Sequence, residues 1–291
     1  MEAQTQHCRE PPGPYGIYDS GSISPANDPT NNTVRLSPAA KIITTNDIII
    51  FGAHSATGAV VGNTLQIDGA QLSTTGVISL YGGYANSGSG AATGNSLTIS
   101  GGSFNAGGAM NLLGGFSFSG TATHNTVTLS GSPQFRATLV IDVYGWFSSG
   151  GDVFTDNTLN VWDYRGSGVS MVRNFQYYNF ILPATMQPGQ ALLPVSGAVT
   201  LGTGTPSTVT GLSQMDGQTA LKPGDTVTLL GGGTVSGSLA NNGRSSAASA
   251  AWGPNWVPGT FPSIRMRMEY RPLHPGPATL AEPPGGWSEL V

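Results

Sequence analysis

A short motif that recurs about every thirty residues constrains the fold of this chain more than any other feature. The motif is an Asn followed by Thr or Ser and then an apolar-x-apolar triplet, and it occurs five times, at intervals of 31, 32, 30 and 32 residues. A fixed period in this range is typical of stacked repeat proteins, in which each unit buries its apolar face only against its neighbours. The five copies begin at Asn32, Asn63, Asn95, Asn125 and Asn157.

The residues that follow each Asn alternate between apolar and polar. In the second and third copies the apolar pairs are Leu65/Ile67 and Leu97/Ile99. A period of two indicates a β-strand with one face turned inward. The sequence therefore predicts an all-β solenoid, a parallel β-helix of about five repeats of 30–32 residues, across residues 31–180. In such a coil we expect the Asn side chains to form an internal ladder that hydrogen-bonds from rung to rung, with a ligand-binding role as the alternative.

A second column of similar residues begins eighteen or nineteen positions after each Asn, in the segments FGAH, YGGY, LGGF, YGWF and FQYY. If one repeat is one turn, the last residue of each segment lies above the next at the strand spacing of about 4.8 Å. We expect these rings to pack on one another, and a carbohydrate-stacking stripe is the alternative if the column faces outward. The predicted aromatic column consists of His54, Tyr84, Phe116, Phe147 and Tyr178.

The composition argues against several classes of function. Only 9% of the residues are charged and the chain has two lysines, so we expect almost no helix. The formal net charge of −4 is small, and the repeats contain no cluster of Lys and Arg, which argues against nucleic-acid binding. Cys8 is the only cysteine and the four histidines are dispersed, so we expect no metal site and no other cofactor. No apolar run is long enough for a membrane-spanning helix.

Parallel β-helices also include enzymes that cleave polysaccharides, so the carboxylates are candidate catalytic groups. Such a site needs convergent acids, usually with a basic residue that stabilises developing charge. Two of the candidates lie in the segment GDVFTDN, where Asp commonly bonds to the turn backbone. We therefore predict no enzyme activity, with a polysaccharide lyase or glycoside hydrolase as the alternative. The candidates are Asp142, Asp152, Asp156 and Asp163, together with Arg165 and Arg173.

The segments on either side of the repeats differ from them in composition. Residues 1–30 lack the motif and are predicted to be irregular. In residues 181–233 two Pro-Gly turns each precede a short apolar segment, which predicts a small β cap on the end of the solenoid. Residues 234–291 are rich in Gly and Ser and then in Pro, which predicts a disordered tail, either a remnant of a larger gene or a native linker.

Part of the sequence resembles a known family. The GGY and GGF repeats, the run from Gly151 to Leu193 and the segment LKPGDTVTLLGGG are similar to the passenger region of bacterial autotransporters of the repeat-rich, adhesin-like kind. The resemblance covers about residues 32–233. It implies a right-handed parallel β-helix at the bacterial cell surface, in the outer membrane or outside the cell. Such a passenger is expected to act as an adhesin or a structural rod, with host or bacterial surface glycans or matrix proteins as partners. We expect neither the family's signal peptide nor its outer-membrane barrel within this sequence.

Overall fold

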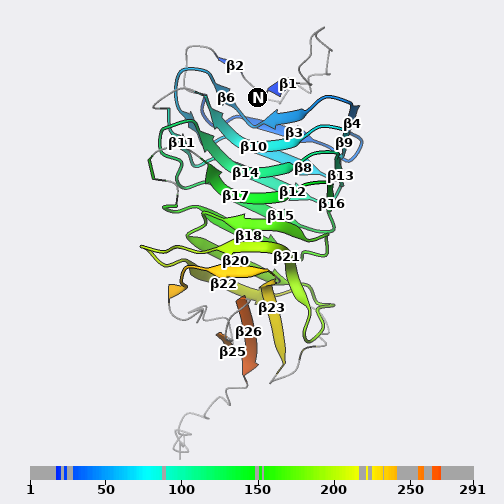
Figure 1. Cartoon of the computed structure of the whole chain (residues 1–291), viewed down its shortest axis with the longest axis vertical. Coiled ribbons are helices and arrows are strands. Elements are labelled where there is room, and N and C mark those ends of the chain that lie inside the picture. The colour runs from blue at the N-terminus through cyan, green and yellow to red at the C-terminus, as the bar shows by residue number, and fades with distance from the viewer. Residues whose placement is uncertain are drawn as a thin grey trace, which may run out of the picture.

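The computed structural model describes most of the repeat region and parts of both ends. Its described residues are 18–20, 23–24, 29–86, 90–147, 151–152, 154–215, 221, 225–231, 233–240, 255–258 and 264–269. Only the backbone is described at 18–20, 23–24, 146–147, 255–258 and 264–269. Every named element in these residues is a β-strand, and almost all of the pairing is parallel. The chain is therefore a parallel β-solenoid, with about six turns rather than the five expected (Figure 1).

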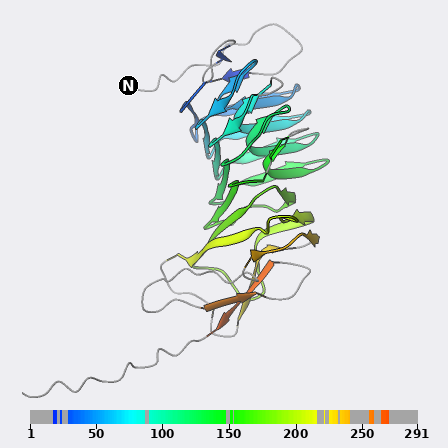
Figure 2. The ribbon, with the colours of Figure 1, turned by 90° about the vertical axis from the view of Figure 1, so that its left-hand side faces the viewer.

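Three sheets run along the axis of the solenoid (Figures 1 and 2). We call the first the motif sheet, because most of its strands directly follow a repeated Asn. It contains β3 (Thr33–Leu36), β8 (Thr64–Asp68), β12 (Ser96–Ser100), β15 (Thr126–Ser130), β18 (Thr158–Trp162), β20 (Tyr177–Leu182) and β22 (Thr208–Gln214).

The other two sheets complete each turn. The short sheet follows the motif sheet in the first four turns and contains β4 (Lys41–Thr44), β9 (Gln71–Thr74), β13 (Ser103–Ala106) and β16 (Gln134–Ala137). The glycine sheet is named for the Gly-Gly pairs of its central strands. It contains β5 (Ile48–Phe51), β10 (Ile78–Ala85), β14 (Met110–Ser117), β17 (Ile141–Phe147), β19 (Val169–Arg173), β21 (Ala191–Thr200) and β23 (Thr226–Gly231). Three small strands follow strands of the glycine sheet along the chain. β6 (His54–Ser55) and β7 (Val60–Val61) come after β5, and β11 (Ala92–Thr93) comes after β10.

The core lies between the sheets and consists of columns of inward-facing apolar residues. Because successive strands pair in register, equivalent residues of successive turns lie one above another. Each fully buried Leu or Val contributes roughly 1.5–3 kcal/mol relative to an exposed side chain. One such column, with no member exposed, is Leu65, Leu97, Val127 and Leu159.

The predicted boundary at residue 180 is wrong, because coiling continues beyond it. β20 spans the boundary and pairs in parallel with β22, and β21 pairs in parallel with both β19 and β23. The described strands within residues 181–233 therefore belong to further turns of the solenoid rather than to a separate cap. The sequence signal ended earlier because the ladder Asn is missing from these turns. The buried hydroxyl of Ser207 instead donates to the carbonyl of Phe175, at 2.8 Å.

The turn that begins with β18 is shorter than those before it. β20 pairs with β18 after only 19 residues, whereas the earlier repeats are 30–32 residues long. This turn has no strand in the short sheet, and backbone hydrogen bonds from Arg165 to Gly131 and from Ser167 to Pro133 take its place. The shortening changes the sequence position of every later strand. The period of 30–32 residues therefore does not predict the strands after this turn.

The structure also differs from the predictions for the two ends. β1 (Tyr18–Ser20) and β2 (Ile23–Ser24) pair in parallel with β5 and β6, so residues 1–30 are not wholly irregular. Within residues 234–291, β24 (Thr234–Ser236) pairs with β21, and β25 (Asn255–Pro258) and β26 (Ile264–Glu269) form an antiparallel hairpin beside β23. Strand edges accept such short additions through backbone hydrogen bonds, which composition does not reveal. Apart from residues 29–30 and 237–240, the remainder of both segments lies outside the described residues.

Candidate functional site

The Asn column forms a continuous hydrogen-bonded ladder inside the solenoid. From the second member on, each side-chain oxygen accepts the backbone N–H of the Asn one turn earlier, at 2.8–3.0 Å. From the second member on, each side-chain nitrogen donates to a backbone carbonyl of the preceding turn, at 2.8–3.0 Å. These four members are fully buried, so the amides satisfy backbone groups at a bend that water does not reach. The ladder consists of Asn32, Asn63, Asn95, Asn125 and Asn157.

A second column, which the sequence analysis missed, lies directly before the ladder. On all five turns this residue has a positive φ, between 54° and 68°. The left-handed conformation favours Gly and is tolerated best by Asn, Asp and His. The shared property is a backbone conformation rather than a residue type, so a search for a recurring letter could not find it. The column is Asn31, Gly62, Gly94, His124 and Asp156.

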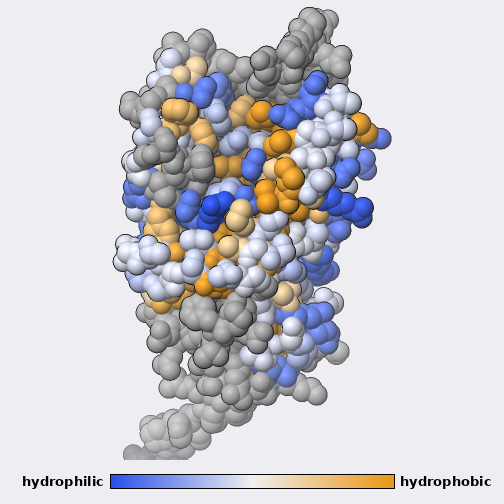
Figure 3. Space-filling view, in the orientation of Figure 1, coloured by the Kyte–Doolittle hydropathy of each residue, from blue (hydrophilic) through white to orange (hydrophobic). Residues whose placement is uncertain are grey.

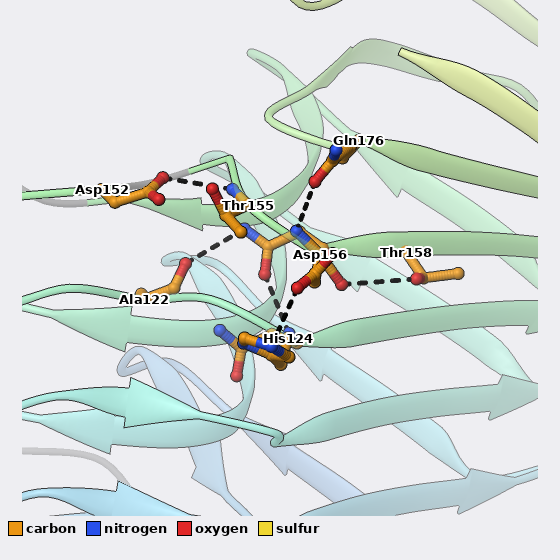
Figure 4. Close-up of polar contacts among 9 residues, drawn as sticks. Ala122, His124, Asp152, Thr155, Asp156, Thr158 and Gln176 are labelled. Atoms are coloured by element: carbon orange, nitrogen blue, oxygen red, sulfur yellow. Dashed lines mark hydrogen bonds and ion pairs between the residues drawn. The ribbon is translucent and has the colours of Figure 1, made fainter. Parts of the chain in front are cut away.

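Two of the candidate aspartates lie in the turn that leads into β18 (Figure 4). The carboxylate of Asp152 accepts the backbone N–H groups of Phe154 and Thr155, at 2.9 and 3.1 Å. Asp156 points toward His124 on the preceding turn, with 2.8 Å between its Oδ2 and the imidazole Nε2. Both carboxylates are thus engaged in contacts that shape the turn.

The other two candidate aspartates lie elsewhere. Asp163 follows β18 at its far end, where it pairs with Arg165 at 2.7 Å. The five residues of β18 place Asp163 at least roughly 16 Å from Asp156 along an extended strand. Asp142 lies on β17, in the glycine sheet. The four carboxylates therefore occupy three separate places, of which Asp152 and Asp156 share one.

The predicted aromatic column lies on the outer side of the glycine sheet. The inner side at this level is filled by the Asn ladder, because a Cβ at Gly83 would lie 2.5 Å from the side chain of Asn95. The rings of His54, Tyr84 and Phe116 are half-buried. The residues that lie in register on consecutive strands are His54, Tyr84, Phe116 and, by its backbone, Phe147.

Tyr178 does not belong to this column, contrary to the prediction. It lies on β20 of the motif sheet, opposite Leu159, and is fully buried in the core. The short turn before β20 moves Tyr178 from one sheet to the other. On the glycine sheet the corresponding strand, β19, instead ends at Arg173, which lies opposite Tyr144.

The rings of the aromatic column are packed against one another. Tyr84 and Phe116 are stacked, with centroids 4.4 Å apart and an interplanar angle of 6°. Tyr81 meets the edges of both rings, at 5.0 and 6.0 Å. A sugar that stacked between these faces would have to displace a neighbouring ring, so the geometry favours a packing ladder. Burial raises the pKa of Tyr81 to about 12 and lowers the pKa of His54.

The structure brings one of the candidate aspartates together with one of the candidate arginines. The phenol of Tyr144 donates to Asp142 Oδ2 at 2.6 Å and accepts a hydrogen bond from the guanidinium of Arg173. Arg173 Nη2 lies 3.6 Å from the same carboxylate oxygen. The guanidinium carbon is 4.4 Å from the centroid of the Tyr144 ring, a cation–π contact. We call these three residues the DYR cluster.

The DYR cluster is buried unevenly and leaves two polar atoms unpaired. The Asp142 side chain is 6% exposed and that of Arg173 is 36% exposed. Within the described residues, the buried atoms Asp142 Oδ1 and Arg173 Nε have no hydrogen-bond partner. Burial raises the pKa of Tyr144 to about 12, and the hydrogen bond and charge of Asp142 act in the same direction. Sequence reasoning did not predict this pairing, because its members belong to turns of unequal length.

The described residues also bear on metal binding, membrane-spanning helices and surface hollows. His, Cys, Asp and Glu side chains nowhere gather there in a group of three or more that could hold a metal ion. No helix in the described part of the chain is long and apolar enough to span a membrane. A shallow hollow of about 400 Å³ has a mainly apolar lining without charged side chains. Its walls are formed chiefly by Ile141, Val169, Ser170, Pro194, Val195 and Ser196.

Comparison with known proteins found no family model, no curated protein and no solved structure that matches this chain.

Proposed function

We propose that this chain is the surface-displayed passenger of an autotransporter-type protein and that it acts as an adhesin. The resemblance of residues 32–233 to adhesin-like passengers supports the assignment to that class. The observation that carries the proposal is the continuous parallel stack itself. Its inner positions are taken by the core and the ladder, which leaves the outer positions of every turn free to present ligand-binding groups.

The outer face of the motif sheet offers groups that suit binding. On β12 and β15 every outward side chain carries a hydroxyl group and none carries a charge. Hydroxyls both donate and accept, and at the rung spacing they can meet successive groups of a ligand. On the face shown in Figure 3, hydrophobic and hydrophilic side chains lie side by side. The partly exposed hydroxyl-bearing residues are Ser96, Thr98, Ser100, Thr126 and Ser130, whereas Thr128 is buried and accepts a hydrogen bond from Asn160.

The length of the described coil favours a binding surface over a spacer. The seven strands of the motif sheet extend about 29 Å along the axis at about 4.8 Å per rung. That is about the diameter of a small domain, so these turns offer lateral surface rather than reach. The structural rod is therefore the weaker form of the proposal.

The distribution of the carboxylates supports binding without turnover. A polysaccharide lyase or hydrolase would need acids directed at one bond, and here Asp152 and Asp156 are engaged in turn contacts while Asp163 pairs with Arg165. Of the four candidate aspartates, Asp142 alone lies beside a basic residue and away from a turn.

An adhesion assay on the whole chain tests the proposal. Beads coated with the purified chain would be applied to surfaces that carry cell-surface glycans, extracellular matrix proteins or acidic polysaccharides. We expect the beads to be retained on at least one surface while no saccharide is released into the supernatant. Beads coated with heat-unfolded chain have the same composition and serve as the control.

Two results would contradict the proposal. Equal retention of native and unfolded chain on every surface would mean that no folded face binds a ligand. Release of saccharide fragments by the native chain, abolished by Asp142→Asn, would instead assign a polysaccharide-cleaving enzyme.

A further inference from the structure

The DYR cluster lies in a pair of columns that run along the outer side of the glycine sheet. The first column is polar, and its upper members are joined by a hydrogen bond of 3.1 Å from the Asn111 amide to the Ser79 hydroxyl. The second column, two residues further along each strand, is largely aromatic and apolar. The polar column is Ser79, Asn111 and Asp142. The apolar column is Tyr81, Leu113 and Tyr144, and Arg173 follows on the next strand.

The two unpaired atoms of the cluster define the chemistry of a partner. Asp142 Oδ1 is a hydrogen-bond acceptor and Arg173 Nε is a donor, and both are buried. A buried polar group without a partner costs about 1–3 kcal/mol, so a group that pairs with both atoms is favoured there. A hydroxyl has this property, because its O–H donates to the carboxylate while its oxygen accepts from the guanidinium.

The charge of the cluster selects among hydroxyl-bearing ligands. The Arg173 guanidinium already faces the Asp142 carboxylate at 3.6 Å, so the positive and negative charges largely cancel. An acidic sugar would bring a second carboxylate toward that of Asp142, without a free cation to receive it. A neutral sugar has no such penalty. Of the adjacent apolar column, Tyr81 is partly exposed and offers the apolar surface that sugar-binding sites place beside their few polar groups, whereas Leu113 and Tyr144 are buried.

We propose that the DYR cluster is the contact point for a neutral glycan, in which Asp142 and Arg173 bind one sugar hydroxyl between them. This inference rests on the proposed adhesin function and specifies its ligand. Arg173 is the most exposed member of the cluster, so the ligand meets it first, and a shift of its side chain gives access to the buried Asp142. The polar column extends the contact to Asn111 on the preceding turn, whose amide is held by its hydrogen bond to the buried Ser79.

Affinity measurements on the full-length chain test this assignment. The probes are soluble dextran, yeast mannan and a β-1,3-glucan, with polygalacturonate as the acidic comparison, each titrated by calorimetry. We expect at least one neutral polysaccharide to bind, and Asp142→Asn and Arg173→Gln each to weaken it about tenfold or more, the loss expected for a hydrogen bond to a charged group. The matched controls are Asp163→Asn and Arg165→Gln. They change the same residue types in an exposed ion pair of 2.7 Å and should leave affinity unchanged.

The outcomes separate this inference from the adhesin proposal. Binding of matrix protein or polygalacturonate that is unaffected by Asp142→Asn and Arg173→Gln would overturn the glycan site and leave the adhesin function standing. Equal losses in the cluster variants and the control variants would also overturn the site, because the effect would then follow overall charge. A chain that adheres to no surface would overturn both. A thermal melt of each variant identifies losses caused by unfolding, and Arg173→Gln, at the partly exposed position, is the variant least prone to them.

Discussion

At the scale of single residues, the ladder explains why this chain repeats Asn rather than another polar residue. Asn95 accepts from the backbone and side chain of Asn63, and it donates to Asn125 and to the carbonyl of Val60. Only a side-chain amide combines an acceptor with two donors in this size. The sequence could predict the ladder because every member needs the same chemistry. It could not predict the left-handed column, where residues as different as Gly94 and His124 meet the same need.

Replacing Asn95 by Ala should strongly destabilise the fold. The change leaves the buried N–H of Asn63 and the carbonyl of Val60 without partners, which predicts a loss of about 2–4 kcal/mol in the free energy of unfolding. Chemical denaturation followed by circular dichroism measures it. Asn105→Ala, at an exposed position on β13, is the control and should stay within about 0.5 kcal/mol. Similar losses at both positions would mean that the ladder has no special role.

The tyrosines make stability fall at high pH. Burial raises the pKa of Tyr81 and Tyr144 to about 12, from an ordinary value near 10. Between pH 10 and 12 the unfolded chain releases these phenol protons while the folded chain keeps them, so the free energy of unfolding decreases as the pH rises through this window. Below pH 10 both states are protonated and this contribution is constant. Phenolate absorbance of the folded chain should rise in a late phase that the urea-unfolded chain lacks. Identical titrations would contradict this prediction.

At the scale of elements, the Gly-Gly pairs are explained by a close approach between sheets. A Cβ at Gly82 would lie 2.3 Å from the carbonyl oxygen of Gly114 and 2.6 Å from the backbone of Ser96, neither of which can move aside easily. The sequence predicted the first five strands of the motif sheet because each has a strict alternation after its Asn, whereas β20 and β22 follow no ladder Asn. It did not predict where the short sheet ends, because the turn after Thr158 replaces a strand with isolated backbone hydrogen bonds.

Gly82→Ala should therefore be far more harmful than its size suggests. The added methyl group forces the glycine sheet away from the motif sheet, which predicts a loss of about 1–3 kcal/mol in the free energy of unfolding. Gly204→Ala is the matched control, because nothing lies within 4 Å of a Cβ there, and it should change stability by no more than about 0.5 kcal/mol. Thermal melts of both variants measure the difference. An unchanged melting temperature for Gly82→Ala would refute the close approach.

At the scale of the whole molecule, one periodic signal was sufficient to predict the class of fold. An interval of about thirty residues with alternating strands leaves few arrangements other than a parallel coil. The candidate site was less accessible to sequence reasoning. Asp142 and Arg173 were both candidates, but the 29-residue register that places Arg173 opposite Tyr144 follows from the shortened turn. The continuation through residues 181–233 was missed for the same reason, because the ladder Asn ends before the coil does.

The adhesin proposal and the glycan site both require that residues about thirty positions apart lie one above another. Disulfide trapping measures this directly, in a chain whose only native cysteine, Cys8, is replaced by Ser. Gln66→Cys combined with Thr98→Cys places two thiols on register partners, about 4.8 Å apart, within the range that a disulfide spans. Gln66→Cys combined with Thr128→Cys places them two rungs apart, at about 9.6 Å, which is too far. Mass spectrometry after mild oxidation should find the disulfide in nearly all molecules of the first variant and in almost none of the second. Comparable yields in both variants, or a higher yield in the second, would contradict the parallel coil and every proposal that depends on it.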